Sequence, residues 1–289
     1  MRVANIDGRL ALKEPDGYRD VATASAGRFG PDPQSVFEVW EEFAAWAREA
    51  PAGPGGPADD GSLVEPGGDT VWGPPVPRPA QIFAVGLNYR DHVVESGLEI
   101  PREPAVFTKF ATSLTGHERP VELPDGLVDW EAELVAVIGR RCHRVTRETA
   151  WSHVAGLTVG QDLSERRLQL TGPAPQFSLG KSYPGFAPLG PELVSTDEFA
   201  DPGDLELGCM LEGGEVLQKS RTSQMIFDVP ELVARLSAVC PLLPGDLIFT
   251  GTPAGVGGAR TPQKFLAPGD VLVTWIDGIG TLRTPMRAA

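Results

Sequence analysis

Basic residues are scarce relative to acidic ones in this chain. Its 289 residues include 25 Lys and Arg against 39 Asp and Glu, which gives a formal net charge of −14. A protein that binds nucleic-acid phosphates or an anionic membrane surface usually presents a basic patch. The charge therefore argues against both nucleic acid and membrane as partners.

Cysteine is also rare, and long apolar runs are missing. The three cysteines, Cys142, Cys209 and Cys240, are widely spaced and match neither a zinc motif nor a disulfide framework. No apolar run approaches the length of a bilayer span, and the N-terminus has no signal-peptide core. These features predict a globular protein of the cytoplasm.

Glycine and proline, in contrast, are plentiful, at 34 and 28 residues. They follow no fixed period, which excludes collagen and favours a loop-rich, largely β architecture. A hydrophobic content of 41% suffices for a sizeable core. Strand and helix patterns do not alternate regularly, so a doubly wound parallel sheet is not expected. We predict an α+β fold that is predominantly β.

Residues 1–75 are predicted to form a small N-terminal α+β domain with a linker, ahead of a larger domain at 76–289. Asp7-Gly8 divides two short apolar stretches, as in a β-hairpin. Residues 35–47 have helical apolar spacing. Residues 51–79 are rich in Pro and Gly and lose all periodicity, which is typical of a linker.

Strand patterns dominate the second domain. Strands are predicted at 82–85, 130–138 and 154–159, and helices at 88–97, 163–170 and 229–239. Three Pro-Gly-Asp triplets, each ahead of an apolar strand, predict tight turns at 202–204, 244–246 and 268–270.

Acidic residues at strand ends are the first candidates for chemistry. Glu131 and Glu133 lie two residues apart, so in a strand they point to the same face. Adjacent carboxylates repel each other unless a cation lies between them, and a hard divalent cation prefers such oxygen ligands. A solvated strand face is the alternative. Asp162 ends the next strand and could be a third ligand, although its spacing to Glu165 favours an N-cap of the helix at 163–170.

Two further segments carry candidate polar groups. His92 and Glu95 lie one helical turn apart, so the carboxylate can orient the imidazole as a general base; a surface ion pair is the alternative. The glycine-rich residues 250–258 contain Thr252 and form either a wide turn or a loop that binds an oxyanion. Lys181 lies in a Gly-Lys-Ser triplet that lacks the upstream glycine of a phosphate loop.

Together these segments resemble the fumarylacetoacetate hydrolase family over residues 78–289. The motifs occur in the family's order at 85–92, 107–109, 129–134, 160–166, 180–182 and 250–257. Each motif is weak alone, but their order and proportion are specific. The resemblance implies a mixed β-sheet roll, often described as a distorted barrel, with a small N-terminal domain and a homodimeric assembly.

The resemblance also implies roles for individual residues. Glu131, Glu133 and Asp162 match the carboxylates that hold Mg²⁺ or Mn²⁺. His92 and Glu95 match a pair that activates water, and Lys181 matches an active-site lysine. The positions that match substrate contacts are Lys109, Arg166, Gln169 and Thr252. Gly160-Gln161 and Phe110 depart from the usual family residues, and we expect these departures to alter the pocket more than the metal site.

The implied activity is metal-dependent hydrolysis of a carbon–carbon bond in a small β-diketo acid, either an acylpyruvate or a compound like fumarylacetoacetate. The same scaffold could instead decarboxylate an oxaloacetate-type acid, or isomerise or hydrate a 2-hydroxydienoate from aromatic catabolism. A protein with a purely structural metal is the alternative from another class. Since fold does not fix function, the sequence leaves the substrate open.

Overall fold

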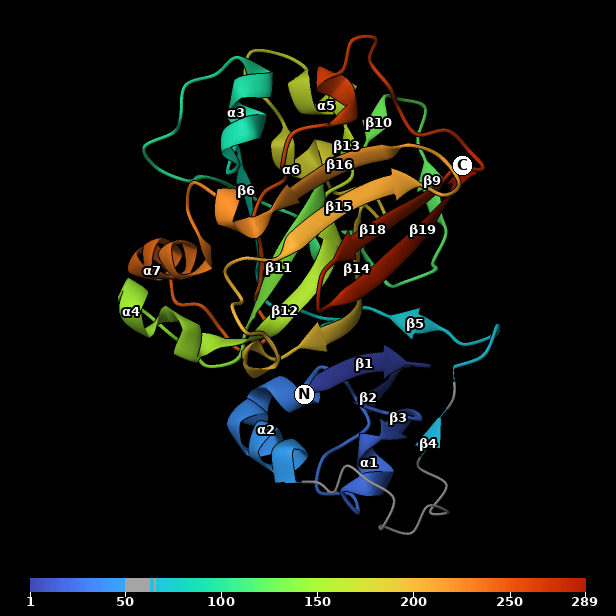
Figure 1. The fold of residues 1–289 in the computed structure, drawn as a ribbon, viewed down its shortest axis with the longest axis vertical. Coiled ribbons are helices and arrows are strands. Elements are labelled where there is room, and N and C mark those ends of the chain that lie inside the picture. Colours follow the sequence, from blue (N-terminus) through green and yellow to red (C-terminus); the bar gives the residue numbers. More distant parts are fainter. Residues whose placement is uncertain (50–62, 65) are drawn as a thin grey trace.

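The computed structural model describes residues 1–49, 63–64 and 66–289, and it confirms an α+β fold that is mainly β. The strands form a twelve-stranded sheet, a five-stranded sheet and a two-stranded pair. Most neighbouring strands are antiparallel, but three pairs are parallel, so the architecture is mixed. Both larger sheets are open at their edges and do not close into a barrel (Figure 1).

The twelve-stranded sheet takes its strands from the chain between Arg2 and Phe249. Its main path is β4 (Leu63–Val64), β3 (Gly17–Asp20), β2 (Arg9–Glu14), β1 (Arg2–Ile6), β14 (Ala187–Val194), β12 (Val154–Gln161), β11 (Ala132–Ile138), β17 (Leu247–Phe249), β6 (Ile82–Gly86) and β7 (Ala105–Thr108). Two short strands lie off this path, β5 (Trp72–Gly73) on β1 and β8 (Leu114–Thr115) on β14.

The five-stranded sheet is built from the C-terminal part of the chain and one earlier strand. Its order is β16 (Val216–Arg221), β15 (Glu206–Leu211), β18 (Val271–Ile276), β19 (Gly280–Ala288) and β9 (Val121–Leu123). The separate pair consists of β10 (Val128–Asp129) and β13 (Ser164–Glu165).

The helices are short and lie around these sheets. They are α1 (Val21–Ala24), α2 (Trp40–Glu49), α3 (Arg90–Ser96), α4 (Arg147–Ala150), α5 (Arg166–Leu170), α6 (Phe177–Gly180) and α7 (Val229–Val239). Figure 1 shows α3, α5 and α6 at one end of the molecule, with α2 and the N-terminal strands at the other. Within the described residues, no helix is long and apolar enough to cross a membrane.

Strand β11 lies at the centre of the core and is buried on both faces. One face of β11 packs toward the five-stranded sheet. Its side chains are Leu134, Ala136 and Ile138, and they share a core with Leu207 and Ile276. Val135 points the other way, into a second core that it shares with the N-terminal Phe43. A strand buried on both faces needs a continuous apolar run, which explains the composition of 134–138.

Several predicted elements are confirmed. Strands β1 and β2 form the hairpin that turns at Asp7-Gly8, where both residues have positive φ angles. Helix α7 has the predicted bounds, and the Asp228 side chain accepts a hydrogen bond from the Glu231 amide at its N-terminus. The helix expected at 35–47 is divided into a 3₁₀ turn at Ser35–Val39 and α2.

The first segment of the chain joins the large sheet directly, because β1 pairs with β14. In the Gly- and Pro-rich stretch 51–79, residues 51–62 and 65 lie outside the described residues, and the rest includes β4 and β5. The division at residue 75 into two domains stays a prediction.

The helix predicted at 163–170 begins later, at Arg166. Ser164 and Glu165 form β13 instead, and Glu165 is the N-cap residue, since its side chain accepts hydrogen bonds from two amides of α5. The interpretation of Asp162 as the N-cap, which spacing alone favoured, is therefore wrong. Asp162 lies between β12 and β13, where its carboxylate is available to the site described next.

Candidate active site

Three carboxylates meet where β11 begins and β12 ends. The two strands are antiparallel, and Ala132 at the start of β11 pairs with Gln161 at the end of β12. This register brings Asp162 beside Glu131 and Glu133, about thirty positions earlier in the chain. Oxygen atoms of the three side chains lie within 4.8 Å of one another, and all three residues are buried.

Basic side chains surround two of these three carboxylates. Lys181 Nζ lies 2.8 Å from Glu131 Oε2 and 2.6 Å from Asp162 Oδ2. Lys109 Nζ lies 2.5 Å from Asp162 Oδ1 and also donates to the carbonyl oxygen of Lys181. Burial of an unpaired charge destabilises the folded state. The two lysines therefore compensate the carboxylates that they contact, and the carboxylates compensate the lysines.

Glu133 is the exception within this cluster. Among the described residues, its side chain makes no ion pair and accepts one hydrogen bond, from the Gly251 amide to Oε2 at 2.7 Å. Burial and the neighbouring carboxylates of Asp162 and Glu131 raise the pKa of Glu133 well above its usual value. For Glu131, burial works in the same direction, but Lys181 and Arg166 outweigh it and lower the pKa to about 2.

This arrangement fits a divalent cation. A carboxylate that faces two others and has no basic partner is expensive to ionise in a buried site, and a cation between the three would remove that cost. Hard cations such as Mg²⁺ prefer carboxylate oxygens. Glu131, Glu133 and Asp162 are the residues that would hold the ion.

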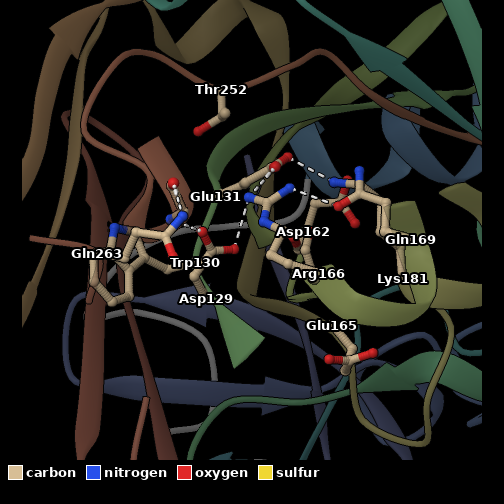
Figure 2. A network of polar contacts seen from close by, with 12 residues as sticks. Asp129, Trp130, Glu131, Asp162, Glu165, Arg166, Gln169, Lys181, Thr252 and Gln263 are labelled. Carbon is tan, nitrogen blue, oxygen red and sulfur yellow. Dashed lines mark hydrogen bonds and ion pairs between the residues drawn. The ribbon is translucent and has the colours of Figure 1, made fainter. Parts of the chain in front are cut away.

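Arg166 connects the cluster to a neighbouring loop. Its Nη2 lies 2.7 Å from Glu131 Oε1 and 2.7 Å from Asp129 Oδ1 (Figure 2). Its Nη1 donates to Gln169 Oε1 at 2.8 Å. Asp129 in turn accepts a hydrogen bond from the Gly258 amide at 2.6 Å. These contacts with Asp129, Glu131 and Gln169 hold the Arg166 guanidinium in place without a ligand.

Helix α3 brings His92 to the same place. Its Nδ1 lies 3.0 Å from Glu95 Oε2, and the other Glu95 oxygen accepts a hydrogen bond from the Gly255 amide at 2.9 Å. Gly97 ends the helix in a left-handed conformation, with φ +67°. Glu95 therefore orients the imidazole and also attaches α3 to the glycine-rich loop.

The Thr252 hydroxyl makes two hydrogen bonds to other groups of the protein. Its hydroxyl donates to the Ala132 carbonyl at 2.9 Å and accepts from Gln218 Nε2 at 2.8 Å. Gln218 also accepts from the Ala132 amide. The hydroxyl thus attaches the glycine-rich loop to the start of β11 and aligns it with the carboxylates.

A cavity of about 390 Å³ opens beside these groups. The predicted site residues that line it are His92, Glu131, Arg166, Gln169, Lys181 and Thr252. Glu133 and Asp162 do not line it, and neither does Lys109, which is buried against Asp162. In this geometry Lys109 is suited to holding Asp162 in place, and its contact with substrate remains a prediction.

A sequence profile of the domain described as fumarylacetoacetate (FAA) hydrolase C-terminal matches residues 81–287. The chain belongs to the fumarylacetoacetate hydrolase family. It is 42% identical to a mitochondrial oxaloacetate tautomerase of Xenopus laevis over 214 residues, which cover 73% of this chain and 67% of the relative. A human mitochondrial oxaloacetate tautomerase is also 42% identical, over 76% of this chain and 70% of the relative.

Solved structures of the family cover the whole chain. One from Mycobacterium smegmatis, assigned provisionally as HpcE, has 53% identity and a TM-score of 0.92, with complete coverage of both chains. Maleylpyruvate hydrolase from Sphingobium, in complex with manganese(II) and pyruvate, has 27% identity and a TM-score of 0.79, again with complete coverage of both. The chain is accordingly an enzyme of this superfamily.

The two departures from the family pattern lie away from the cavity wall. Gln161 is fully buried, and its side chain accepts from the Glu131 amide and donates to Thr274. Phe110 is 47% exposed and does not line the cavity. Gln161 thus contacts the backbone of Glu131, a proposed metal ligand, and the expectation that the two departures alter the pocket more than the metal site stays a prediction.

Sequence reasoning missed the polar residues that hold the site from behind. Asp129 and Gln218 are both buried, and they contact the site residues Arg166 and Thr252. Asp129 stands inside the recognised motif at 129–134, and this position was a usable signal. Gln218 lies in β16, more than eighty residues from Ala132, and no local pattern distinguishes it from a solvated strand residue.

Proposed function

We propose that this enzyme is a divalent-metal-dependent hydrolase that cleaves a carbon–carbon bond in a β-diketo acid of the acylpyruvate type. The observation that carries the proposal is the shared cavity. His92, which is hydrogen-bonded to Glu95, lines the same space as Glu131 of the carboxylate cluster and Lys181. A base for water and an electrophilic centre for the keto acid are the two parts that this reaction needs.

The proposed cofactor is Mg²⁺ or Mn²⁺, held by Glu131, Glu133 and Asp162. When bound, such an ion supplies Lewis acidity to the keto oxygens of the substrate. Lys181 pairs with Glu131 and lines the cavity, which supports the proposal that it stabilises negative charge that develops on the substrate. Removal of a comparable charge-stabilising group costs enzymes about 10²–10³ in kcat.

His92 would begin the reaction by removing a proton from water. The water oxygen forms a bond to the ketone carbon of the acyl group, and the bond from that carbon to the central methylene then breaks. The electron pair of the broken bond stays with the methylene carbon, giving the enolate of pyruvate. Protonation of this enolate yields pyruvate, and the acyl group leaves as a carboxylic acid.

A second candidate function is keto–enol tautomerisation of an oxaloacetate-like acid. It is favoured by the 42% identity to proteins named oxaloacetate tautomerases. His92 and Lys181 could move the proton between carbon and oxygen without any bond to water. The two candidates differ in outcome, since only hydrolysis breaks the carbon skeleton.

A single assay separates these candidates. The purified protein is mixed with acetylpyruvate or oxaloacetate, with Mg²⁺ or Mn²⁺, and both the diketo-acid absorbance and released pyruvate are followed. Hydrolysis predicts stoichiometric pyruvate and acetate from acetylpyruvate, and EDTA should abolish it. Loss of the enol absorbance of oxaloacetate without pyruvate would favour tautomerisation, and pyruvate with CO₂ from oxaloacetate would favour decarboxylation.

The Asp162→Ala variant tests the assignment of the site in the same assay. We expect it to lose metal binding and turnover together, because Asp162 also anchors Lys109 and Lys181. Full metal-dependent activity in this variant would contradict the proposal. A homodimeric assembly and a cytoplasmic location are proposed with it, on the family resemblance and the sequence respectively.

A further inference from the structure

Most of the charged side chains that line the cavity are already paired within the protein. Its charged and paired lining residues are His92, Glu131, Arg166 and Lys181, all of which belong to the site already described. Most of the remaining wall is aliphatic or aromatic, and includes Leu98, Phe107, Leu127, Leu170, Phe177 and Phe265. A site for a uniformly polar ligand would need polar partners along its whole length.

The apolar wall begins beside Lys181. Lys181 Nζ lies 5.2 Å from the centroid of the Phe107 ring, and Phe107 packs edge-to-face on Phe177 at 5.7 Å between centroids. A ligand that reaches the carboxylate cluster with its keto-acid end therefore lays the rest of its length against aromatic rings.

The outer part of the wall is unusually open to solvent. Leu170, the last residue of α5, is 63% exposed, and Leu98, just after α3, is 55% exposed. Both line the cavity, although they come from separate segments. Apolar side chains that remain exposed around a cavity gain stability when an apolar ligand covers them.

One charged residue of the cavity lining lies outside the ion pairs described above. Arg167 is the lining residue with a charge that makes no ion pair within the described part of the chain. It is exposed to solvent. An ion pair with an exposed arginine contributes little, about 0–1 kcal/mol. A carboxylate directed toward Phe107 and Leu98 would lose its hydration without gaining a partner there, so an uncharged group fits this wall better.

We propose that the substrate is a β-diketo acid whose acyl group is apolar, uncharged and several carbons long, rather than a four-carbon acid or a dicarboxylate. The keto-acid end lies at Glu131 and Lys181, and the acyl chain follows the Phe107–Phe177 wall toward Leu98 and Leu170. This inference rests on the proposed hydrolase function and adds to it the class of the acyl group.

A homologous substrate series tests the inference. We compare kcat/KM for acetyl-, butanoyl- and hexanoylpyruvate with the values for fumarylpyruvate, which carries a distal carboxylate, and for oxaloacetate. Each added methylene should raise kcat/KM about fourfold, the fold-change that corresponds to about 0.8 kcal/mol per buried CH₂. Fumarylpyruvate and oxaloacetate should fall below the hexanoyl compound by more than tenfold.

Charged substitutions at the exposed positions give a second measurement with little risk to folding. Leu98→Glu and Leu170→Glu should each lower the hexanoyl-to-acetyl ratio of kcat/KM at least fivefold. The matched control is Val239→Glu, which alters an 85% exposed residue of α7 outside the cavity lining and should leave the ratio unchanged.

Different outcomes contradict different statements. No pyruvate from any acylpyruvate would contradict the proposed function itself. Turnover of the series with a flat chain-length dependence, or unchanged ratios in both glutamate variants, would overturn only the inference about the acyl group. A preference for fumarylpyruvate that disappears in Arg167→Gln would also overturn it and would assign the distal end to a carboxylate.

Discussion

At the scale of single residues, the three carboxylates of the candidate site differ in the groups that compensate their negative charge. Glu131 and Asp162 have lysine partners at hydrogen-bond distance, whereas Glu133 has a backbone amide and two like charges. These three acids are all buried but have different electrostatic environments. This difference leads to the first prediction.

Glu133→Gln should remove metal binding without destabilising the metal-free protein. The substitution keeps the shape and the acceptor for Gly251 but removes a charge that burial and its neighbours disfavour. For the wild type, Mn²⁺ at a hundred times its Kd should stabilise the fold by about 2.7 kcal/mol. In thermal unfolding, the variant should show no rise in Tm with Mn²⁺.

The control for this experiment is Glu192→Gln. Glu192 is also buried, but it pairs with Arg2 and Tyr18 far from the cavity. This variant should lose stability and yet keep its full response to Mn²⁺. An Mn²⁺-dependent rise in the Tm of Glu133→Gln equal to that of the wild type would show that Glu133 is not a ligand.

Asp20 leads to a prediction about pH. Burial favours its neutral form, but hydrogen bonds from Arg9 and Thr23 outweigh burial and lower its pKa in the folded state. A lowered folded-state pKa means that the stabilisation is present above the unfolded pKa and is lost as the pH falls through the folded value. Asn can still cap the helix, so Asp20→Asn mainly removes the ion pair with the half-exposed Arg9. The substitution should therefore cost roughly 0.2–1 kcal/mol at pH 7 and much less near pH 3.

Urea unfolding of the wild type and Asp20→Asn at several pH values measures this difference. The control is Asp16→Asn, in the exposed turn between β2 and β3, which should have little effect at any pH. A cost for Asp20→Asn that stays constant down to pH 3 would exclude ionisation of Asp20 as the cause.

At the scale of elements, the Glu95 carboxylate has two roles in α3: it orients His92, and it attaches the helix to the glycine-rich loop. Glu95 holds His92 through one oxygen and the Gly255 amide through the other. The helix has seven residues, and such a short helix depends on tertiary contacts for its stability. A change at Glu95 should therefore affect the imidazole and the closure of the cavity together.

Glu95→Gln should lower kcat for acylpyruvate hydrolysis by about 10²–10⁴, the usual contribution of a general base. The amide can donate a hydrogen bond to Nδ1, which would place the imidazole proton on Nε2 and prevent it from accepting a proton from water. Glu99→Gln, at an exposed position three residues beyond the end of α3, is the matched control. Wild-type kcat in Glu95→Gln would exclude the pair from the reaction.

On the scale of the whole molecule, the large sheet is covered on both faces. One face packs on the five-stranded sheet, and the other packs on the N-terminal segment, where Phe43 and Val135 share a core. The site lies at the end of strands that both cores support. Its geometry therefore depends on parts of the chain that contribute no side chain to it.

A fragment of residues 76–289 should fail to fold cooperatively, even though it contains every proposed site residue. Removal of the N-terminal segment exposes one face of β11 and leaves β14 without its partner β1. Thermal unfolding of the fragment, followed by circular dichroism with and without Mn²⁺, measures this directly. A cooperative transition with metal-dependent activity would show instead that the predicted boundary at residue 75 separates independent domains.

Much of the fold could be predicted from local patterns in the sequence. The hairpin at Asp7-Gly8 and helix α7 depend on backbone preferences and capping within a few residues, so short windows suffice to recognise them. The helix at 163–170 was misjudged because Ser164 and Glu165 pair with β10, a contact some thirty-five residues away in the chain.

The sequence by itself determined which residues could carry chemistry, because acidic, basic and imidazole groups in ordered motifs limit the reactions available. Only the tertiary structure decided that Asp162 is a member of the acidic cluster and not a helix cap, and that Lys109 does not line the cavity. It also decided that Asp129 and Gln218 support the site. These outcomes depend on strand register and burial, and both arise from contacts between segments that are distant in the chain.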